Sequence, residues 1–286
     1  MEIKENYLNI GCGNKFHEDW VNIDIVSYNP NVIEHNILLG LPFETNQFDA
    51  VYHSQVLEHI PKESAHSFIA ECFRVLKPGG ILRVVVPDLE NIVSEYQKYL
   101  NLCIIESNEN SEANYEWILL EMYDQTIRNH SGGLMAQYLQ KTTITNEEYV
   151  LNRIGFVGKH IRKSYLEGNN EVKSNNTFVH LKTFVLKIGR NLHYEKIRKR
   201  ILSFVLTKQE LDSLQIGKFR LGGEIHYWMY DRHSLNTLLN NVGFINISVK
   251  TPFESTIPNW IKFELDVKEG TIYDPTSLFM EAQKPK

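Results

Sequence analysis

The sequence predicts an α/β fold with a mostly parallel sheet and a large helical insertion. Three observations support this prediction. In the first third of the chain, apolar strand-like runs alternate with an apolar pattern of helical period. A glycine turn, Gly11-Cys12-Gly13, directly follows the first of these runs. The stretch 91–223 then carries helical patterns that have no place between the strands of such a sheet.

Composition limits the class of protein. The chain has 286 residues, of which 42% are hydrophobic and 23% charged, so it can bury a core of its own. A net charge of −5 gives no general attraction to nucleic acid or to an anionic membrane. The three cysteines are an odd number without CxxC spacing, which argues against a disulfide framework and a zinc site. No stretch is long enough to span a bilayer, so a cytoplasmic location is expected.

Five strands are expected in the first third, and a helix at 62–76 that ends at the breaker cluster Lys77-Pro-Gly-Gly80. Because strands and helices alternate, the sheet should be parallel, with its ligand beyond the carboxyl ends of the strands. The connection 11–20 is near the minimum of about 10–12 residues for a parallel crossover, so the first helix should be very short. The expected strands are 8–10, 20–25, 31–37, 48–52 and 80–86.

The residues that follow these strands suit a nucleoside. Closely spaced glycines at Gly11 and Gly13 let a ligand approach the backbone. Asp24, at the end of the second strand, can accept hydrogen bonds from ribose hydroxyls. After the third strand, Asn36 can hydrogen-bond an adenine edge while Ile37 packs on the ring.

Two other ligand classes fit less well. A dinucleotide fingerprint needs a third glycine where Phe16 stands, and an acid about 20 residues past the glycines, whereas Asp24 comes much sooner. A phosphate-binding loop needs Gly-Lys-Ser/Thr after four residues, and this motif is absent.

Six motifs occur in order: Leu8-Asn-Ile-Gly-Cys-Gly13, Val21-Asn-Ile-Asp24, Leu41-Pro-Phe43, Phe48-Asp49, Val56-Leu-Glu-His-Ile60 and Arg74-Val-Leu-Lys-Pro-Gly-Gly80. Together they resemble the class I S-adenosylmethionine-dependent methyltransferases, in particular the small-molecule branch that includes sugar and natural-product enzymes. The resemblance resumes at 228–244. It implies a Rossmann-like seven-stranded sheet, with a last core helix near Asp231, a strand at 245–250 and an antiparallel final strand at 277–283.

The resemblance also implies the roles of residues in cofactor binding. The glycine turn would pass under the methionine portion, Asp24 would bind the ribose, and Ser54 would lie near the methionine amine. Family members commonly have Asp where Asn36 stands. His59 either lines the methyl-transfer cleft or caps backbone at a helix start. The implied cofactor is S-adenosylmethionine, with S-adenosylhomocysteine as product, and no metal is expected. The expected cofactor-binding residues are Gly11, Cys12, Gly13, Asp24, Ile25, Asn36, Ile37, Ser54 and His59.

The middle of the chain is expected to cover this cofactor. Residues 1–90 and 224–286 would form the catalytic core, and 91–223 a helical lid that forms the acceptor site. Helices are expected there at 91–99, 115–127, 147–154 and 207–214.

Several residues in and beside the lid are candidates for the acceptor site. Arg128 could clamp an anionic acceptor and His130 could accept its proton, or both could simply end a helix. His226, Tyr227 and Tyr230 lie where the lid returns to the core. Asp88 is either an acceptor contact or a helix N-cap. The predicted catalytic candidates are therefore His130, His226 and Asp88, and the predicted substrate contacts are Arg128, Tyr227 and Tyr230.

The predicted function is direct in-line methylation of an oxygen atom. The acceptor would be a hydroxyl of a sugar or natural product, or a carboxylate of a small peptide-like product, and a homodimer is left open. One alternative is a catalytically silent scaffold. The other is an RNA methyltransferase that uses the basic segment 182–200, which holds seven lysines and arginines.

Overall fold

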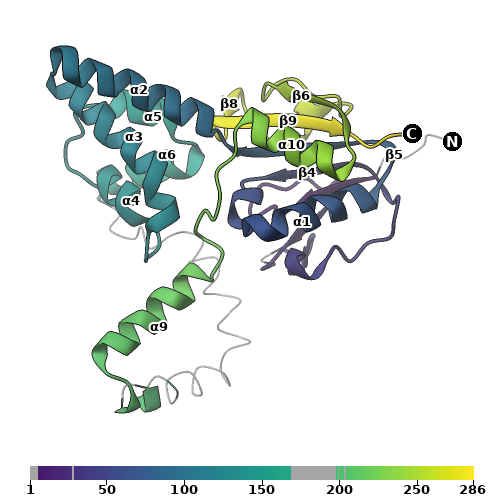
Figure 1. Cartoon of the computed structure of the whole chain (residues 1–286), viewed down its shortest axis with the longest axis horizontal. Helices are drawn as coiled ribbons and strands as arrows, with labels where there is room; N and C mark the ends of the chain where they lie inside the picture. The colour runs from purple at the N-terminus through teal and green to yellow at the C-terminus, as the bar shows by residue number, and fades with distance from the viewer. Residues whose placement is uncertain (1–5, 28, 169–197, 199, 203) are drawn as a thin grey trace.

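The computed structural model describes residues 6–27, 29–168, 198, 200–202 and 204–286 (Figure 1). Its main sheet has seven strands in the order β3-β2-β1-β4-β5-β9-β6. The first five strands pair in parallel, whereas β9 is antiparallel to both of its neighbours. The Rossmann-like sheet with an antiparallel last strand is therefore confirmed. The strands are β1 (Tyr7–Ile10), β2 (Trp20–Asp24), β3 (Val32–Glu34), β4 (Phe48–Ser54), β5 (Leu76–Pro87), β6 (Ile245–Lys250) and β9 (Ser277–Gln283).

The strand order reverses at β1, which pairs with β2 on one side and with β4 on the other. Ile10 lies opposite both Ile23 and His53, so these three strands end close together at one edge of the sheet. The residues that follow them meet there, at the kind of crevice where open α/β sheets bind ligands.

Two helices cover one face of the sheet: α1 (Lys62–Val75) and α10 (Arg232–Val242) (Figure 1). α10 begins with a capping box in which Asp231 and Ser234 hydrogen-bond each other's backbone, and it ends at Gly243 in the left-handed conformation. The buried apolar side chains of both helices join those of the strands in the largest core of the molecule.

The opposite face has a different cover. Here the aromatic residues Tyr7, Trp20 and Tyr52 pack against the 3-10 helix η3 (Trp260–Phe263). Arg83, fully buried on β5, pairs with Asp266 at 2.7 Å and with Glu281 at 2.8 Å. A segment between β6 and β9, which includes the small sheet of β7 (Val267–Lys268) and β8 (Thr271–Ile272), thus covers this face in place of long helices.

Between β5 and α10 the described chain is helical. Figure 1 shows α2 to α6 gathered beside the sheet, while α9 projects away from both. The four helices expected here are present: α2, α3 and α9 are longer than predicted, and α5 ends one residue before its predicted end. α4 and α6 were not predicted. No helix within the described residues is long and apolar enough to cross a membrane. The helices are α2 (Leu89–Glu106), α3 (Glu109–Ile127), α4 (Gly133–Leu139), α5 (Glu147–Arg153), α6 (Phe156–Leu166) and α9 (Lys208–Arg220).

The connection from β1 to β2 corrects one expectation. We expected a very short helix, but residues 11–19 form only turns. Gly11 and Gly13 both have positive φ, which a right-handed helix cannot contain. The side chain of Asn9 also donates to the carbonyl of Lys15 at 2.9 Å, which holds the loop back against β1.

Candidate functional site

Gly11 and Gly13 are glycines for different structural reasons. Gly11 has φ +63° and Gly13 has φ +51°. A Cβ added to Gly11 would collide with the side chain of Val56, so this glycine is needed for packing. A Cβ at Gly13 would meet nothing within 4 Å. The space beside Gly13 is therefore open to a ligand that approaches the backbone.

Asp24 lies directly beside this turn. Its carboxylate accepts hydrogen bonds from the backbone N–H of Gly13 at 2.8 Å and of Val26 at 3.2 Å. A carboxylate has about four lone-pair sites, so it can still accept from hydroxyl groups of a ligand. The adjacent Ile25 is 64% exposed, although it is apolar.

The residues after β3 form the 3-10 helix η1 (Ile37–Leu39). The exposed Asn36 caps it by accepting from the N–H of Leu38 at 3.0 Å. Ile37 packs against the core, whereas Leu39 is 80% exposed. An exposed apolar surface therefore lies beside the polar groups at this edge, as an adenine ring would require.

The end of β4 supplies Ser54, which is nearly buried. The ammonium group of Lys15 lies 3.4 Å from its hydroxyl and 2.8 Å from the carboxylate of Asp274. Burial raises the pKa of the nearby Cys12 to about 12, so this residue stays a neutral thiol.

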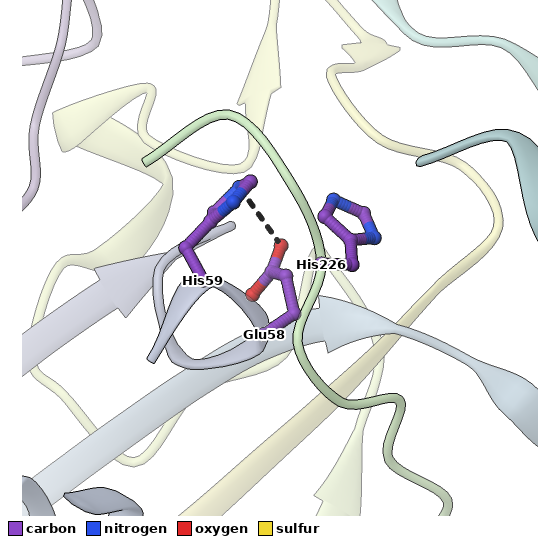
Figure 2. Close-up of side chains that lie close together, drawn as sticks. All are labelled: Glu58, His59 and His226. Carbon is purple, nitrogen blue, oxygen red and sulfur yellow. Dashed lines mark ion pairs between the residues drawn. The ribbon is translucent and has the colours of Figure 1, made fainter. Parts of the chain in front are cut away.

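Three titratable side chains come together where the chain returns from the helical region (Figure 2). Glu58 and His59 belong to the 3-10 helix η2 (Leu57–His59), and His226 comes from the returning segment. The rings of His59 and His226 lie 4.7 Å apart. Glu58 is fully buried, and neither of its carboxylate oxygens has a hydrogen-bond partner. This cluster was not predicted as a unit, because nothing in the sequence shows that Glu58 is buried or that His226 lies beside it.

Burial governs the protonation of the cluster. It raises the pKa of Glu58 to about 8 and lowers the pKa of both histidines, that of His226 well below its usual range. The imidazoles are therefore neutral near pH 7.

Backbone hydrogen bonds hold the cluster together. The N–H of Tyr227 donates to the carbonyl of Glu58 at 2.7 Å, and the N–H of His226 donates to the carbonyl of Gln125 at 2.9 Å. The ring nitrogen Nδ1 of His59 lies 2.9 Å from the carbonyl of Ile225. The returning segment is thus fixed to η2 on one side and to α3 on the other.

The contacts of Arg128 and His130 do not favour the roles expected for them in binding the acceptor. The guanidinium of Arg128 pairs with Asp124 at 2.6 Å and with Glu224 at 3.1 Å, so two carboxylates already occupy it. This arrangement does not favour a clamp for an anionic acceptor. His130 is exposed, and its Nδ1 contacts the carbonyl of Ser131 at 3.3 Å.

Asp88, Tyr227 and Tyr230 have structural contacts. Asp88 caps α2 by accepting from the N–H of Glu90 at 3.0 Å, and burial raises its pKa. Tyr227 donates its hydroxyl to the carbonyl of Arg220 at 3.0 Å. Tyr230 is buried in the core with no hydrogen-bond partner for its hydroxyl, and burial raises its pKa to about 12.

Residues 8–84 match the methyltransferase domain family. A Mycolicibacterium smegmatis protein named "Probable S-adenosylmethionine-dependent methyltransferase" is 41% identical over 56 residues, which are 20% of this chain and 21% of that protein. The demethylmenaquinone methyltransferase of Listeria monocytogenes is 25% identical over 162 residues, 48% of this chain and 64% of that one. The chain thus covers less than two thirds of either relative. A solved S-adenosylmethionine-dependent methyltransferase from Archaeoglobus fulgidus is 11% identical, and the match covers 98% of this chain and 86% of that chain with a TM-score of 0.38.

The sheet order, the antiparallel β9 and the glycine turn beside Asp24 define a Rossmann-like methyltransferase fold. Residues 8–84 thus match a methyltransferase domain, and they contain the glycine turn and Asp24. The predicted resemblance to S-adenosylmethionine-dependent methyltransferases is borne out over these residues.

Proposed function

We propose that the protein binds S-adenosylmethionine at the carboxyl edge of β1, β2 and β4 and methylates an oxygen atom of a small-molecule acceptor. The observation that carries the proposal is the open space beside Gly13, whose N–H is bonded to the carboxylate of Asp24. A ligand at this edge would meet exposed backbone, a carboxylate that can accept hydrogen bonds from its hydroxyl groups, and apolar surface. When bound, S-adenosylmethionine would supply a methyl group activated by the positive charge of its sulfur.

The chain would hold this cofactor through few groups. Asp24 would accept from the ribose hydroxyls, while Asn36, Ile25 and the exposed part of η1 would contact the adenine. Gly13 would give the methionine portion room, and Ser54 would lie near its amine. Cys12 and Ile37 are buried or core-packed and would support the turn and η1 from behind.

The acceptor would lie between η2 and the returning segment, under the helical region 91–223. A hydroxyl acceptor needs a base. Of the three candidates, His226 is supported best, because its ring lies 4.7 Å from that of His59 near the cofactor edge. His130 is exposed and Asp88 caps α2, so both are less suited. The exposed Tyr227 lies on the same segment and would contact the acceptor.

Calorimetric titration with S-adenosylmethionine tests the cofactor site. We expect the wild type to bind, and Asp24→Ala to lose at least about 100-fold in affinity because it loses charge-assisted hydrogen bonds. Asp212→Ala, an exposed acid on α9, is the matched control and should bind like the wild type. Undiminished binding by Asp24→Ala, or no binding by the wild type, would refute the site.

The acceptor atom is tested with a labelled methyl group. A panel of hydroxylated glycosides and short peptides should give a labelled product whose bond type identifies the acceptor. A methyl ester releases methanol in mild base, whereas a methyl ether does not. Cofactor binding without transfer to any oxygen acceptor would favour the silent scaffold. The basic segment 182–200 of the RNA alternative lies almost entirely outside the described residues.

A further inference from the structure

We propose that Glu58, His59 and His226 bind a divalent transition-metal ion of the zinc type. Each of the three offers one ligand atom, and these atoms all lie within 4.8 Å of one another. Among the described residues, no other histidine, cysteine or acidic side chains form such a group of three. No metal was expected from the sequence, so this is a site beyond the proposed methyl transfer.

The carboxyl group of Glu58 gives the strongest support for a ligand at this site. It is fully buried, and both of its oxygens lack a hydrogen-bond partner. Buried polar groups are nearly always hydrogen-bonded, whereas these two oxygens have no partner among the described residues. The nearest cation described, the ammonium group of Lys15, pairs with Asp274 at 2.8 Å and makes no hydrogen bond to Glu58. In Figure 2 the carboxylate points toward the ring of His59, and the ring of His226 lies across the returning segment.

The orientation of His59 suits a ligand. Its Nδ1 lies 2.9 Å from the carbonyl of Ile225, and only a protonated nitrogen can donate to a carbonyl oxygen. The other ring nitrogen, Nε2, therefore has a free lone pair, and it lies 4.0 Å from Oε1 of Glu58. A histidine that donates one N–H to backbone and offers its second nitrogen is the usual arrangement around a bound metal.

Distance and ligand type indicate which metal. Zinc ligands lie about 2.0–2.1 Å from the ion, which puts tetrahedral ligand atoms roughly 3.4 Å apart. The cluster therefore has to contract by about 1 Å, which side-chain rotation at χ2 and χ3 can supply. Two imidazoles and one carboxylate suit zinc and its transition-metal neighbours better than Mg²⁺ or Ca²⁺, which prefer oxygen ligands.

Three protein ligands leave one position of a tetrahedral ion open. An acceptor oxygen would occupy it, and the ion would then lower the pKa of an acceptor hydroxyl in place of a free His226 acting as the base. This single step rests on the proposed function. Metal binding itself does not depend on methyl transfer.

The test is a metal titration of chelator-treated full-length protein without cofactor or acceptor. The visible absorption of bound Co²⁺ reports the coordination geometry of the site. Zn²⁺ should displace the Co²⁺ with a stoichiometry of about one ion per chain. We expect Glu58→Gln, His59→Gln and His226→Gln each to lose more than the roughly 10–100-fold that follows loss of a group outside the ligand set. Mg²⁺ should not compete.

Exposed histidines can bind metal adventitiously, so His66→Gln on α1 is the matched control and should titrate like the wild type. Circular dichroism of each variant shows whether it has folded. The proposal is overturned if the wild type gives no tetrahedral Co²⁺ spectrum, or if folded His59→Gln and His226→Gln bind as tightly as the wild type. Calorimetry with S-adenosylmethionine on the same samples separates the hypotheses, because loss of metal binding alone leaves the proposed function standing.

Discussion

At the scale of single residues, the glycine turn combines two requirements. Gly11 leaves room for Val56, whereas Gly13 leaves room for whatever lies outside the protein. The first is a constraint of folding and the second a constraint of binding, although both residues have positive φ.

Substitution by alanine should separate the two. Gly13→Ala should cost about 1–2 kcal/mol in the free energy of unfolding, because an L-residue is strained at positive φ. Gly11→Ala should cost more, because the same strain is joined by a collision with Val56. Urea unfolding measures both, and equal losses would contradict the packing role of Gly11.

His53 should give the protein a pH-dependent stability. It is fully buried, neither ring nitrogen has a hydrogen-bond partner, and burial lowers its pKa from 6.5 to about 3. Between these values the unfolded chain binds more protons than the folded one, so stability is lost as pH falls through 6.5. From about pH 7 to about pH 5, the free energy of unfolding should drop by about 2 kcal/mol through this group.

The matched variant is His53→Leu, which removes the titrating group. The unfolding free energy of the wild type relative to that of His53→Leu should therefore fall by about 2 kcal/mol between about pH 7 and about pH 5. A difference that does not vary with pH would show that His53 is not buried in its neutral form.

Site residues could be predicted where nearby sequence determines their position, and could not where a partner far along the chain determines it. Gly11, Gly13 and Asp24 follow strands that are legible in the sequence, so their shared edge could be predicted from topology. Arg128 could not be interpreted, because its partner Glu224 is far along the chain. The burial of Glu58 likewise depends on a returning segment whose path the sequence does not show.

At the scale of elements, helix ends were well marked where caps and breakers exist. β6 and β9 have the expected bounds, and α1 ends within a residue of its prediction. α4 and α6 were missed. α4 is short and begins at Gly133, a glycine in the left-handed conformation, which the sequence suggests as a turn. α9 was predicted to end at 214, whereas the helix continues through Gly217 to Arg220.

The start of α10 offers a test of capping. Asp231→Ala should cost about 0.5–2 kcal/mol, because its carboxylate accepts from the N–H of Ser234 at 2.7 Å. Asp231→Asn should cost much less, since asparagine caps almost equally well. Thermal unfolding compares the two, and equal losses would point to the charge of Asp231 instead of its cap.

At the scale of the whole molecule, Arg83 connects the sheet to the segment that covers its second face. It joins Asp266 of that segment to Glu281 of β9, and it also donates to the carbonyls of Thr251 and Glu254. One buried side chain thus fixes three points of the cover to the sheet.

Arg83→Met should therefore be severe. Removing the guanidinium leaves two buried carboxylates unpaired, which typically costs about 3–5 kcal/mol. Arg232→Met, which breaks an exposed pair with Glu90, should cost about 1 kcal/mol or less. Urea unfolding of both variants gives the comparison, and a mild effect of Arg83→Met would mean that the cover is held by its aromatic contacts instead.

The turns at 11–19 affect the electric field at the edge where β1 ends. A helix that began there would direct about half a positive charge from its N-terminus toward a ligand. These turns have no such dipole, and the nearby ammonium group of Lys15 is already neutralised by Asp274. An anionic group that arrives at this edge must compete with Asp274 for Lys15, so its affinity should fall with added salt more steeply than a helix dipole alone would produce.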